Sequence, residues 1–156
     1  MSEASNLVRL LSEGSWTIAC AESLTAGLVS ARIADVPGAS TVLRGGVVAY
    51  DPDVKVELLG LDAEVVARAV VSEEVSLGLA RAARHLLQAD VGIGTTGVAG
   101  PQGHGGEPVG SVWIAVSTPV ADHTRHLHLR GTRAQIREAT VQACLNLAAD
   151  SVSGNI

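Results

Sequence analysis

The sequence predicts an α/β protein, a three-layer α/β/α sandwich with a mixed, mostly parallel sheet. Short apolar or β-branched runs alternate with amphipathic helical segments along the 156 residues. The last two strand-like runs follow each other without a helix between them, which is typical of an antiparallel hairpin. Because no linker, repeat or low-complexity tract interrupts this alternation, we expect a single domain over residues 1–156.

The individual elements follow from periodicity and from residues that start or stop helices. Gly14 and Gly60 predict helix ends, and Asp51-Pro52 predicts a helix start. Thr132 and Gln135 have the spacing of a capping box. We expect helices over residues 4–13, 28–37, 51–60, 72–88 and from 133 onward, and a short helix or turn over 62–69. We expect strands over residues 17–21, 41–50, 90–95, 111–118 and 123–129, with a bulge or close approach at Gly45-Gly46.

Composition narrows the possible functions and partners. The chain is 47% apolar and 17% charged, which excludes disorder, and its net charge of −5 argues against a nucleic-acid binder. No apolar run approaches a membrane span, and residues 1–14 lack the pattern of a signal peptide. We therefore expect a cytoplasmic protein without nucleic-acid or membrane partners, in which the isolated Cys20 and Cys144 are core residues. The positive mean hydropathy also favours a homo-oligomer.

The stretch Thr17–Gly27 changes from a strand pattern to a helix pattern, and Ser23 and Thr25 lie at the changeover. In parallel α/β sheets such turns lie at the carboxyl edge, where ligands usually bind. The free N–H groups of a following helix suit an anion or a developing oxyanion. A nucleophilic Ser23 is therefore one interpretation. The other is that Ser23 or Thr25 only caps the helix.

Lys55 is the only lysine beside ten arginines, and Tyr50, five positions earlier, is the only tyrosine. Lysine can lose its proton in a suitable environment, whereas arginine effectively cannot. A nearby helix start and partial burial would both lower the pKa of Lys55 toward that of a general base. Ser23 and Lys55 could then form a Ser–Lys pair for nucleophilic catalysis. The alternatives are a surface lysine and a half-buried tyrosine at a strand end.

The sequence Gly92-Ile-Gly-Thr-Thr-Gly97 matches the dinucleotide-binding pattern G-x-G-x-x-G. That fold requires a helix to begin inside the motif, and here more glycines and Pro101 follow, so the Rossmann interpretation fails. Seven glycines within residues 92–106 instead predict a loop whose N–H groups can approach a phosphate or oxyanion closely. Thr95 and Thr96 add hydroxyl groups at this edge of the sheet.

Two further groups of side chains could bind a ligand. Arg133 and Arg137 are one turn apart on the final helix and share a face. A cation in a first helical turn is disfavoured, so Arg133 indicates a nearby anion, although a solvated pair explains it equally well. His123, His126 and His128 lack a placed carboxylate and make a poor zinc site, so we expect a solvent-facing strand edge there.

Several of these segments together resemble one known family. They are Ala21-Glu-Ser-Leu-Thr-Ala-Gly27, Gly46-Val-Val-Ala-Tyr50 with Lys55, Val71-Ser72, Thr96-Gly-Val-Ala-Gly-Pro101 and Pro108-Val-Gly110. In this order and spacing they are similar to the CinA C-terminal domain family, the competence/damage-inducible proteins that include nicotinamide-nucleotide amidases. The resemblance covers roughly residues 5–150, and the chain is similar to the family's stand-alone form.

The resemblance implies hydrolysis of the carboxamide of nicotinamide mononucleotide to nicotinate mononucleotide and ammonia, without a metal or other cofactor. It places the nucleophile on Ser23, the family's tyrosine and lysine on Tyr50 and Lys55, its loop threonine on Thr96 and its C-terminal arginine on Arg137. We expect substrate contacts from the turn, the loop and the final helix, at Thr25, Gly27, Thr96, Gly97, Gly100, Arg133 and Arg137.

Several positions depart from the family pattern. A Gly-Ala pair before Val71 is Ala69-Val70 here and a helix glycine is Ala82, but the departures next to Ser23 and before Pro108 matter most. Leu24 and Ala26 stand where the family usually has Cys and Gly, and Glu107 stands where it usually has Lys. Ala26 adds a methyl group to the turn of the nucleophile, and Glu107 adds a negative charge near a phosphate site. The alternative function is therefore a catalytically silent nucleotide-binding or regulatory module of the same fold. The retained Ser23, Tyr50 and Lys55 favour the enzyme, whereas Ala26 and Glu107 favour the alternative.

Overall fold

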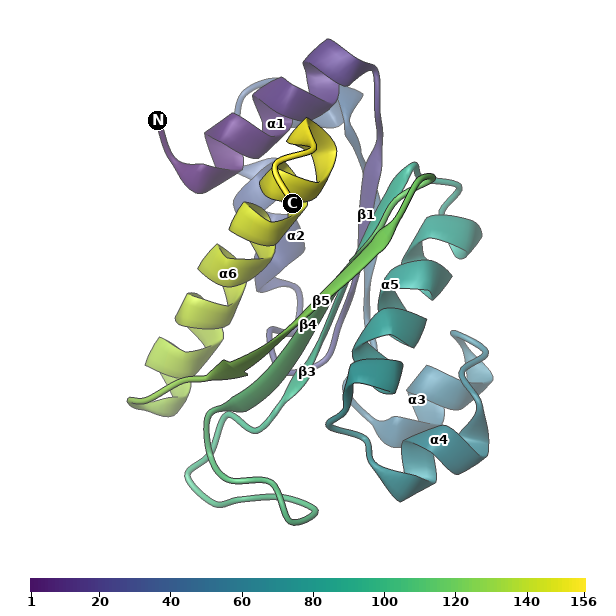
Figure 1. Cartoon of the computed structure of the whole chain (residues 1–156), viewed down its shortest axis with the longest axis vertical. Helices are drawn as coiled ribbons and strands as arrows, with labels where there is room; N and C mark the ends of the chain where they lie inside the picture. Colours follow the sequence, from purple (N-terminus) through teal and green to yellow (C-terminus); the bar gives the residue numbers. More distant parts are fainter.

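One five-stranded sheet with the order β2-β1-β3-β4-β5 runs through the middle of the computed structural model, which describes all residues 1–156 (Figure 1). Its strands are β1 (Ile18–Glu22), β2 (Leu43–Val48), β3 (Val91–Gly97), β4 (Ser111–Ser117) and β5 (Asp122–His128). β2, β1 and β3 pair in parallel, whereas β3–β4 and β4–β5 pair antiparallel. The predicted mixed sheet and the terminal hairpin are confirmed.

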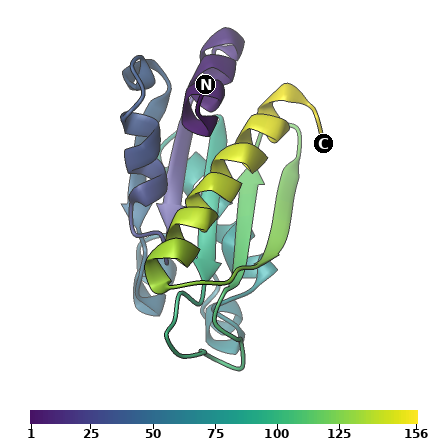
Figure 2. The ribbon, with the colours of Figure 1, turned by 90° about the vertical axis from the view of Figure 1, so that its left-hand side faces the viewer.

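Helices cover both faces of the sheet, as the sequence predicts. They are α1 (Glu3–Gly14), α2 (Leu28–Ala34), α3 (Pro52–Glu57), α4 (Ala63–Arg68), α5 (Glu73–Leu86) and α6 (Arg133–Ser153). Helices α1, α2 and α6 lie on one face, and α5 lies on the other with α3 and α4 at its end (Figures 1 and 2). The larger core cluster, with 24 buried residues, lies between the sheet and α1, α2 and α6. No helix is long and apolar enough to cross a membrane.

The predicted second strand is too long at both ends. Ala39–Thr41 forms a 3₁₀ turn, and β2 stops at Val48, so Tyr50 lies beyond the strand. The predicted irregularity at Gly45-Gly46 is confirmed, because the register with β1 shifts between Ile18 and Ala19. Gly46 is also a close approach, since a Cβ atom there would lie 2.3 Å from the Ser30 Oγ of α2. Because β2 ends at Val48, the chain leaves the sheet there and passes through Tyr50 to the start of α3 at Pro52.

The glycines of the failed dinucleotide motif have a packing role. Residues 92–97 lie entirely within β3, and no helix starts among them. A Cβ atom on Gly92 would lie 1.9 Å from the Ala80 carbonyl oxygen of α5, and one on Gly94 would lie 2.1 Å from that of Ser76. The bare backbone of β3 thus lets α5 pack directly against the centre of the sheet.

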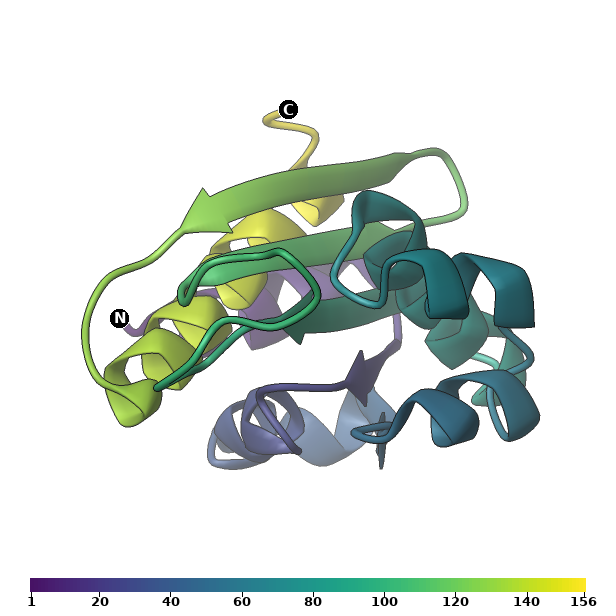
Figure 3. The same cartoon turned by 90° about the horizontal axis from the view of Figure 1, so that it is seen from below.

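The carboxyl ends of β1, β2 and β3 meet at one edge of the sheet, together with the amino ends of α3 and α6. Figure 3 shows this edge, where the loop of residues 98–110 lies between the first turn of α6 and helices α3 and α4. The predicted capping box at the start of α6 is present, with Thr132 and Gln135 each bonding the other's backbone N–H. These elements bring the Ser23 turn, Tyr50 with Lys55, the glycine-rich loop and Arg133 to a common edge.

We expect Gly92→Ala to lower the free energy of unfolding by about 2–3 kcal/mol, because the added methyl group collides with the backbone of α5. Urea unfolding measures this change. The matched control is Gly14→Ala, where the nearest atom to an added Cβ is 3.8 Å away. Equal stability of the two variants would contradict the tight contact between α5 and β3.

Candidate active site

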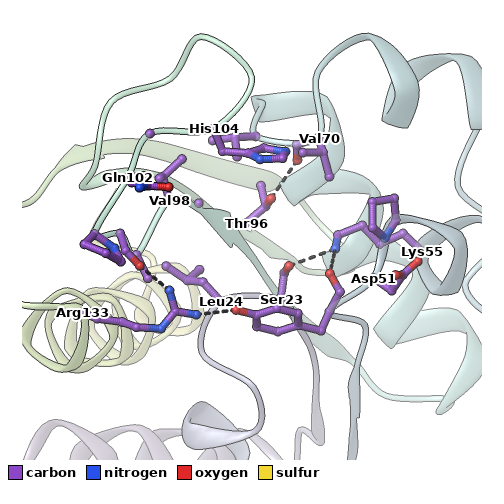
Figure 4. Close-up of a pocket in the computed structure, with 18 residues that line it drawn as sticks. Ser23, Leu24, Asp51, Lys55, Val70, Thr96, Val98, Gln102, His104 and Arg133 are labelled. Carbon is purple, nitrogen blue, oxygen red and sulfur yellow. Dashed lines mark hydrogen bonds between the residues drawn. The ribbon is translucent and has the colours of Figure 1, made fainter.

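A cavity of about 480 Å³ opens at the carboxyl edge of the sheet (Figure 4). It is lined by parts of five segments: Ser23 and Leu24 after β1, Tyr50–Pro52 with Lys55, Val70 and Val71 before α5, residues 96–104, and Arg133. These segments follow β1 and β2, lie at and beyond the end of β3, or belong to α3, except that Val70 and Val71 lie between α4 and α5 and Arg133 begins α6. Its polar groups converge on Ser23 and Lys55 at one end and Arg133 at another (Figure 4).

The Lys55 amine makes three hydrogen bonds inside the protein. Its Nζ lies 2.9 Å from Ser23 Oγ, 2.7 Å from the carbonyl oxygen of Ala49 and 2.9 Å from that of Tyr50. Only 1% of Lys55 is exposed. A neutral amine has two N–H donors and one lone pair. It can therefore donate to the two carbonyls and accept the proton of Ser23 Oγ, which is the arrangement of a base beside its nucleophile.

Burial lowers the pKa of Lys55 from 10.5 to about 8, and the nearby Asp51 carboxylate opposes this shift. The sequence correctly predicts that the pKa of Lys55 is lowered. Burial explains the lower pKa, so the predicted effect of a nearby helix start is not needed. Lys55 lies in the last turn of the six-residue α3 rather than at its amino end. Desolvation disfavours the charged form, because the ammonium loses its hydration when it is buried.

Hydrogen bonds to Thr95 of strand β3 hold the turn that carries Ser23. The Ser23 N–H donates to the carbonyl and to Oγ1 of Thr95 on β3, and Thr25 Oγ1 lies 2.9 Å from the same Oγ1. The interpretation of Ser23 or Thr25 as a helix cap is wrong, because Gly27 is the N-cap residue of α2. Ser23 is thus free to point its hydroxyl group at Lys55. Thr25 is fully buried and supports the turn from below.

The turn is strained at Ala26, one of the departures from the family pattern. Ala26 has a φ of +48° and Gly27 one of +96°, so both lie in the left-handed region. A residue with a Cβ atom costs about 1–2 kcal/mol there, whereas glycine does not. The methyl group of Ala26 itself is exposed and does not enter the cavity.

Arg133 and Tyr50 meet across the mouth of the cavity. The guanidinium group of Arg133 donates to the Tyr50 hydroxyl and to the carbonyl oxygen of Gly100 in the glycine-rich loop. It forms no ion pair with a carboxylate. An unpaired guanidinium group at the amino end of the 21-residue α6 makes this wall of the cavity attractive to an anion.

Arg137 has a different position from its neighbour one turn earlier. Its Nε donates to the Leu24 carbonyl oxygen at 2.8 Å, and a terminal nitrogen donates to that of Thr25 at 3.2 Å. It therefore binds the backbone of the Ser23 turn and does not line the cavity. The two arginines do share one side of α6, as predicted, but only Arg133 reaches the cavity.

The end of β3 and the glycine-rich loop after it line another side of the cavity, and their residues differ in role. Thr96 is buried and donates its hydroxyl to the Val70 carbonyl oxygen at 2.8 Å, which ties β3 to the segment before α5. Gly97 and Gly100 line the cavity. The carboxylate of Glu107 accepts a hydrogen bond from Ser111 and does not line this cavity, although it lines a smaller one beside it.

Seven of the ten predicted site residues line the cavity, namely Ser23, Tyr50, Lys55, Thr96, Gly97, Gly100 and Arg133. Thr25, Gly27 and Arg137 lie outside it and support the Ser23 turn. Gln102 and His104 also line the cavity, and no sequence pattern predicts this, because exposed loop side chains carry no periodic signal. Glu22 was not predicted as a site residue either, although a charged residue that ends an apolar strand is a signal in itself.

The remaining predicted groups lie away from the cavity. The rings of His126 and His128 contact each other with centroids 4.3 Å apart, and His126 also stacks on Trp113, on the edge strand β5 and its neighbour. No group of three or more potential ligands is placed to hold a metal ion. Cys20 and Cys144 are free and buried, as predicted.

The fold and the site together define an α/β protein with a buried Ser–Lys pair at the carboxyl edge of its sheet. Residues 2–152 match the CinA C-terminal domain, and the chain belongs to this family. It is 41% identical over 146 residues to a CinA-like protein of Frankia casuarinae, an alignment that covers 93% of this chain and 34% of that protein. This chain spans about a third of the length of the curated relatives it matches.

Solved structures of the same superfamily share the fold. A CinA superfamily protein of Klebsiella pneumoniae superposes with a TM-score of 0.94 at 25% identity, over 97% of this chain and 96% of that one. One from Escherichia coli has a TM-score of 0.91 at 27% identity, over 94% and 87% of the two chains. These findings confirm the resemblance found in the sequence.

We expect Ala26→Gly to raise the free energy of unfolding by about 0.5–1 kcal/mol, because glycine relieves the left-handed strain but gains entropy when unfolded. Ala31→Gly is the matched control, since Ala31 is exposed within α2, and there the same change costs about 1 kcal/mol. Chemical denaturation of both variants measures the difference. A loss of stability at both positions would show that Ala26 is not strained.

Proposed function

We propose that this chain hydrolyses the carboxamide of nicotinamide mononucleotide to nicotinate mononucleotide and ammonia. The observation that carries the proposal is the 2.9 Å contact between Lys55 Nζ and Ser23 Oγ inside a cavity that also holds an unpaired arginine. The Ser23–Lys55 pair suits nucleophilic attack on an amide, and the arginine suits binding of a phosphate. Family membership supports the same assignment.

Lys55 activates Ser23 in the proposed reaction. Its neutral amine takes the Oγ proton while Oγ attacks the carboxamide carbon, and the resulting ammonium gives that proton to the carboxamide nitrogen, which leaves as ammonia when its bond to carbon breaks. The same amine then takes a proton from the water that attacks the acyl carbon and returns it to Ser23 Oγ as the ester bond breaks and the carboxylate leaves. The Ala49 and Tyr50 carbonyls hold Lys55 in place through both steps. The backbone carbonyl of Tyr50 accepts a hydrogen bond from Lys55, and the Tyr50 hydroxyl accepts one from Arg133.

The tetrahedral intermediate needs hydrogen-bond donors for its oxyanion. The Ser23 N–H cannot serve, because it already donates to Thr95. The amides of Leu24 and Thr25 donate no hydrogen bond within the chain, although both residues are buried. Arg137 binds the Leu24 carbonyl, which shares a peptide plane with the Thr25 N–H, so it fixes how that N–H is turned. The Leu24 N–H shares its plane with the Ser23 carbonyl, which accepts from the Ala26 N–H. We assign the oxyanion to the Leu24 and Thr25 amides and assign Arg137 to the orientation of the Thr25 amide.

Arg133 is the proposed ligand of the substrate phosphate. It lines the cavity, carries no carboxylate partner and lies at the positive end of a helix. Glu107, which replaces the family's usual lysine, is turned toward Ser111 and does not oppose a phosphate in this cavity. Thr96 and the glycines around it complete the binding wall.

Release of ammonia from nicotinamide mononucleotide tests the proposal. We expect Ser23→Ala and Lys55→Met each to lower kcat by about a hundredfold or more, and the double variant to be little worse than either. Methionine suits this site because it keeps much of the buried stem without a charge. Wild-type protein that binds the nucleotide but releases no ammonia would instead favour the silent binding module.

The pH dependence of kcat/KM tests the base. The working form of Lys55 is the neutral amine and its pKa is about 8, so kcat/KM should rise with pH through about 8 and level off above it. The rise reflects loss of the Lys55 proton, and the rate is lost as pH falls and the ammonium forms. A rise centred well below 7 would assign the base to another group and contradict this role for Lys55.

The two arginines should separate binding from turnover. We expect Arg133→Gln to raise KM for the mononucleotide by about 10–100-fold, through loss of a charge-assisted hydrogen bond, without affecting the phosphate-free nucleoside. Arg137→Gln should lower kcat for both substrates with little change in KM. Steady-state kinetics on the two substrates provide the comparison, and the reverse pattern would exchange the two assignments.

A further inference from the structure

Glu22, the residue before Ser23, is a buried carboxylate that the proposed reaction does not use. Only 1% of it is exposed, at the end of β1. Its Oε1 accepts the Val29 N–H at 2.9 Å, and its Oε2 accepts the N–H and the hydroxyl of Ser30 at 3.0 and 2.8 Å. All three donors belong to the first turn of α2, so one side chain satisfies the start of that helix.

This contact replaces an ordinary helix cap. The N-cap residue of α2 is Gly27, which has no side chain and makes no capping bond. Helices normally use a side chain at that position to bind their first free N–H groups, and an anion there also interacts favourably with the helix dipole. Glu22, at the end of β1 and five residues before Gly27, binds the first N–H groups of α2 and places a carboxylate at the positive end of the helix. The turn between Glu22 and α2 is thereby closed by a contact between its two ends.

The backbone of Glu22 is joined to the base as well. Its carbonyl oxygen accepts the Ala49 N–H at 2.8 Å, and the Ala49 carbonyl in turn accepts from Lys55 Nζ at 2.7 Å. Glu22 therefore lies at a junction between the segment that carries the nucleophile and the segment that holds the base. A shift of this residue would move Ser23 Oγ relative to Lys55 Nζ.

We propose that Glu22 is a positioning residue for the Ser23 nucleophile, acting through its grip on the amino end of α2. The inference rests on the proposed function, because it concerns the rate of that same site. A misplacement of about 1 Å at a catalytic group can cost about a hundredfold in rate. The shape of the turn is thus set by Glu22 at its ends and by Thr95 and Arg137 along its length.

Glu22→Gln is the direct test, because glutamine has the same shape but turns an N–H₂ donor toward one of the helix N–H groups. We expect kcat on nicotinamide mononucleotide to fall about tenfold or more with KM within about twofold of wild type. Amide hydrogen exchange at Val29 and Ser30 should accelerate. The rise of kcat/KM through pH 8 should stay in place, since the carboxylate acts on position and not on the charge of Lys55.

Ser2→Ala is the matched control, since it removes the cap of α1, where Ser2 accepts from the Ser5 N–H far from the cavity. It should lower the melting temperature without changing kcat. If Glu22→Gln does not fold, Ser30→Ala removes one of the three bonds and should lower kcat about threefold with the same faster exchange. Unchanged kcat in the folded variant, or a pH profile that moves, would overturn the positioning role.

The two proposals fail in different ways. If the wild-type protein releases no ammonia, the proposed function is wrong, and the exchange rates at Val29 and Ser30 still report whether Glu22 holds the turn. If the wild-type protein is active and Glu22→Gln is equally active, the function stands and the inference about Glu22 is wrong.

Discussion

The burial of one amine sets the requirements for the rest of the site. Lowering the pKa of Lys55 from 10.5 to about 8 moves the balance between its charged and neutral forms by about 3 kcal/mol toward the neutral amine, relative to a lysine in water. That is a substantial part of the 5–15 kcal/mol by which domains are usually stable. The surrounding fold must therefore hold the amine in place, and the Ala49 and Tyr50 carbonyls do so at the point where β2 has already ended.

Two parallel strands and one short helix meet this requirement together. Ser23 directly follows β1, and the two carbonyl groups belong to Ala49 and Tyr50, which directly follow β2. Lys55 on α3 contacts both of these segments. The early end of β2 matters here, because successive carbonyl groups of a regular strand point in opposite directions and could not both accept from one amine. The irregular stretch after Val48 instead leaves them free to accept from the amine.

Much of this arrangement could be predicted from the sequence, for identifiable reasons. The order of elements follows from periodicity and caps, and the Thr132–Gln135 capping box is present as predicted. Unique residues such as Lys55 attract a chemical explanation, and the site geometry is consistent with it. The roles of Arg133 and Arg137 could not be separated, because residues one turn apart share a face and only packing decides which of them reaches the cavity.

Other features depend on contacts between distant segments, which no local pattern encodes. Gly92 and Gly94 look like a nucleotide motif, and only the position of α5 reveals that they are there for packing. Glu22 lies in an apolar strand pattern, yet its partners are the first amides of the following helix. The strain at Ala26 is likewise invisible in the sequence, because the family's glycine at that position could serve a turn or mere flexibility.

Lys55 and Arg133, the two basic residues of the cavity, have different surroundings, and this difference fits the proposed chemistry. Lys55 is desolvated and can give up its charge, whereas a guanidinium group keeps its charge at any accessible pH. Arg133 is held only by the neutral oxygens of Gly100 and Tyr50, so no carboxylate cancels its field. One end of the cavity can therefore present a neutral base while the other stays positive. A site that must both deprotonate a hydroxyl and bind a phosphate requires that division.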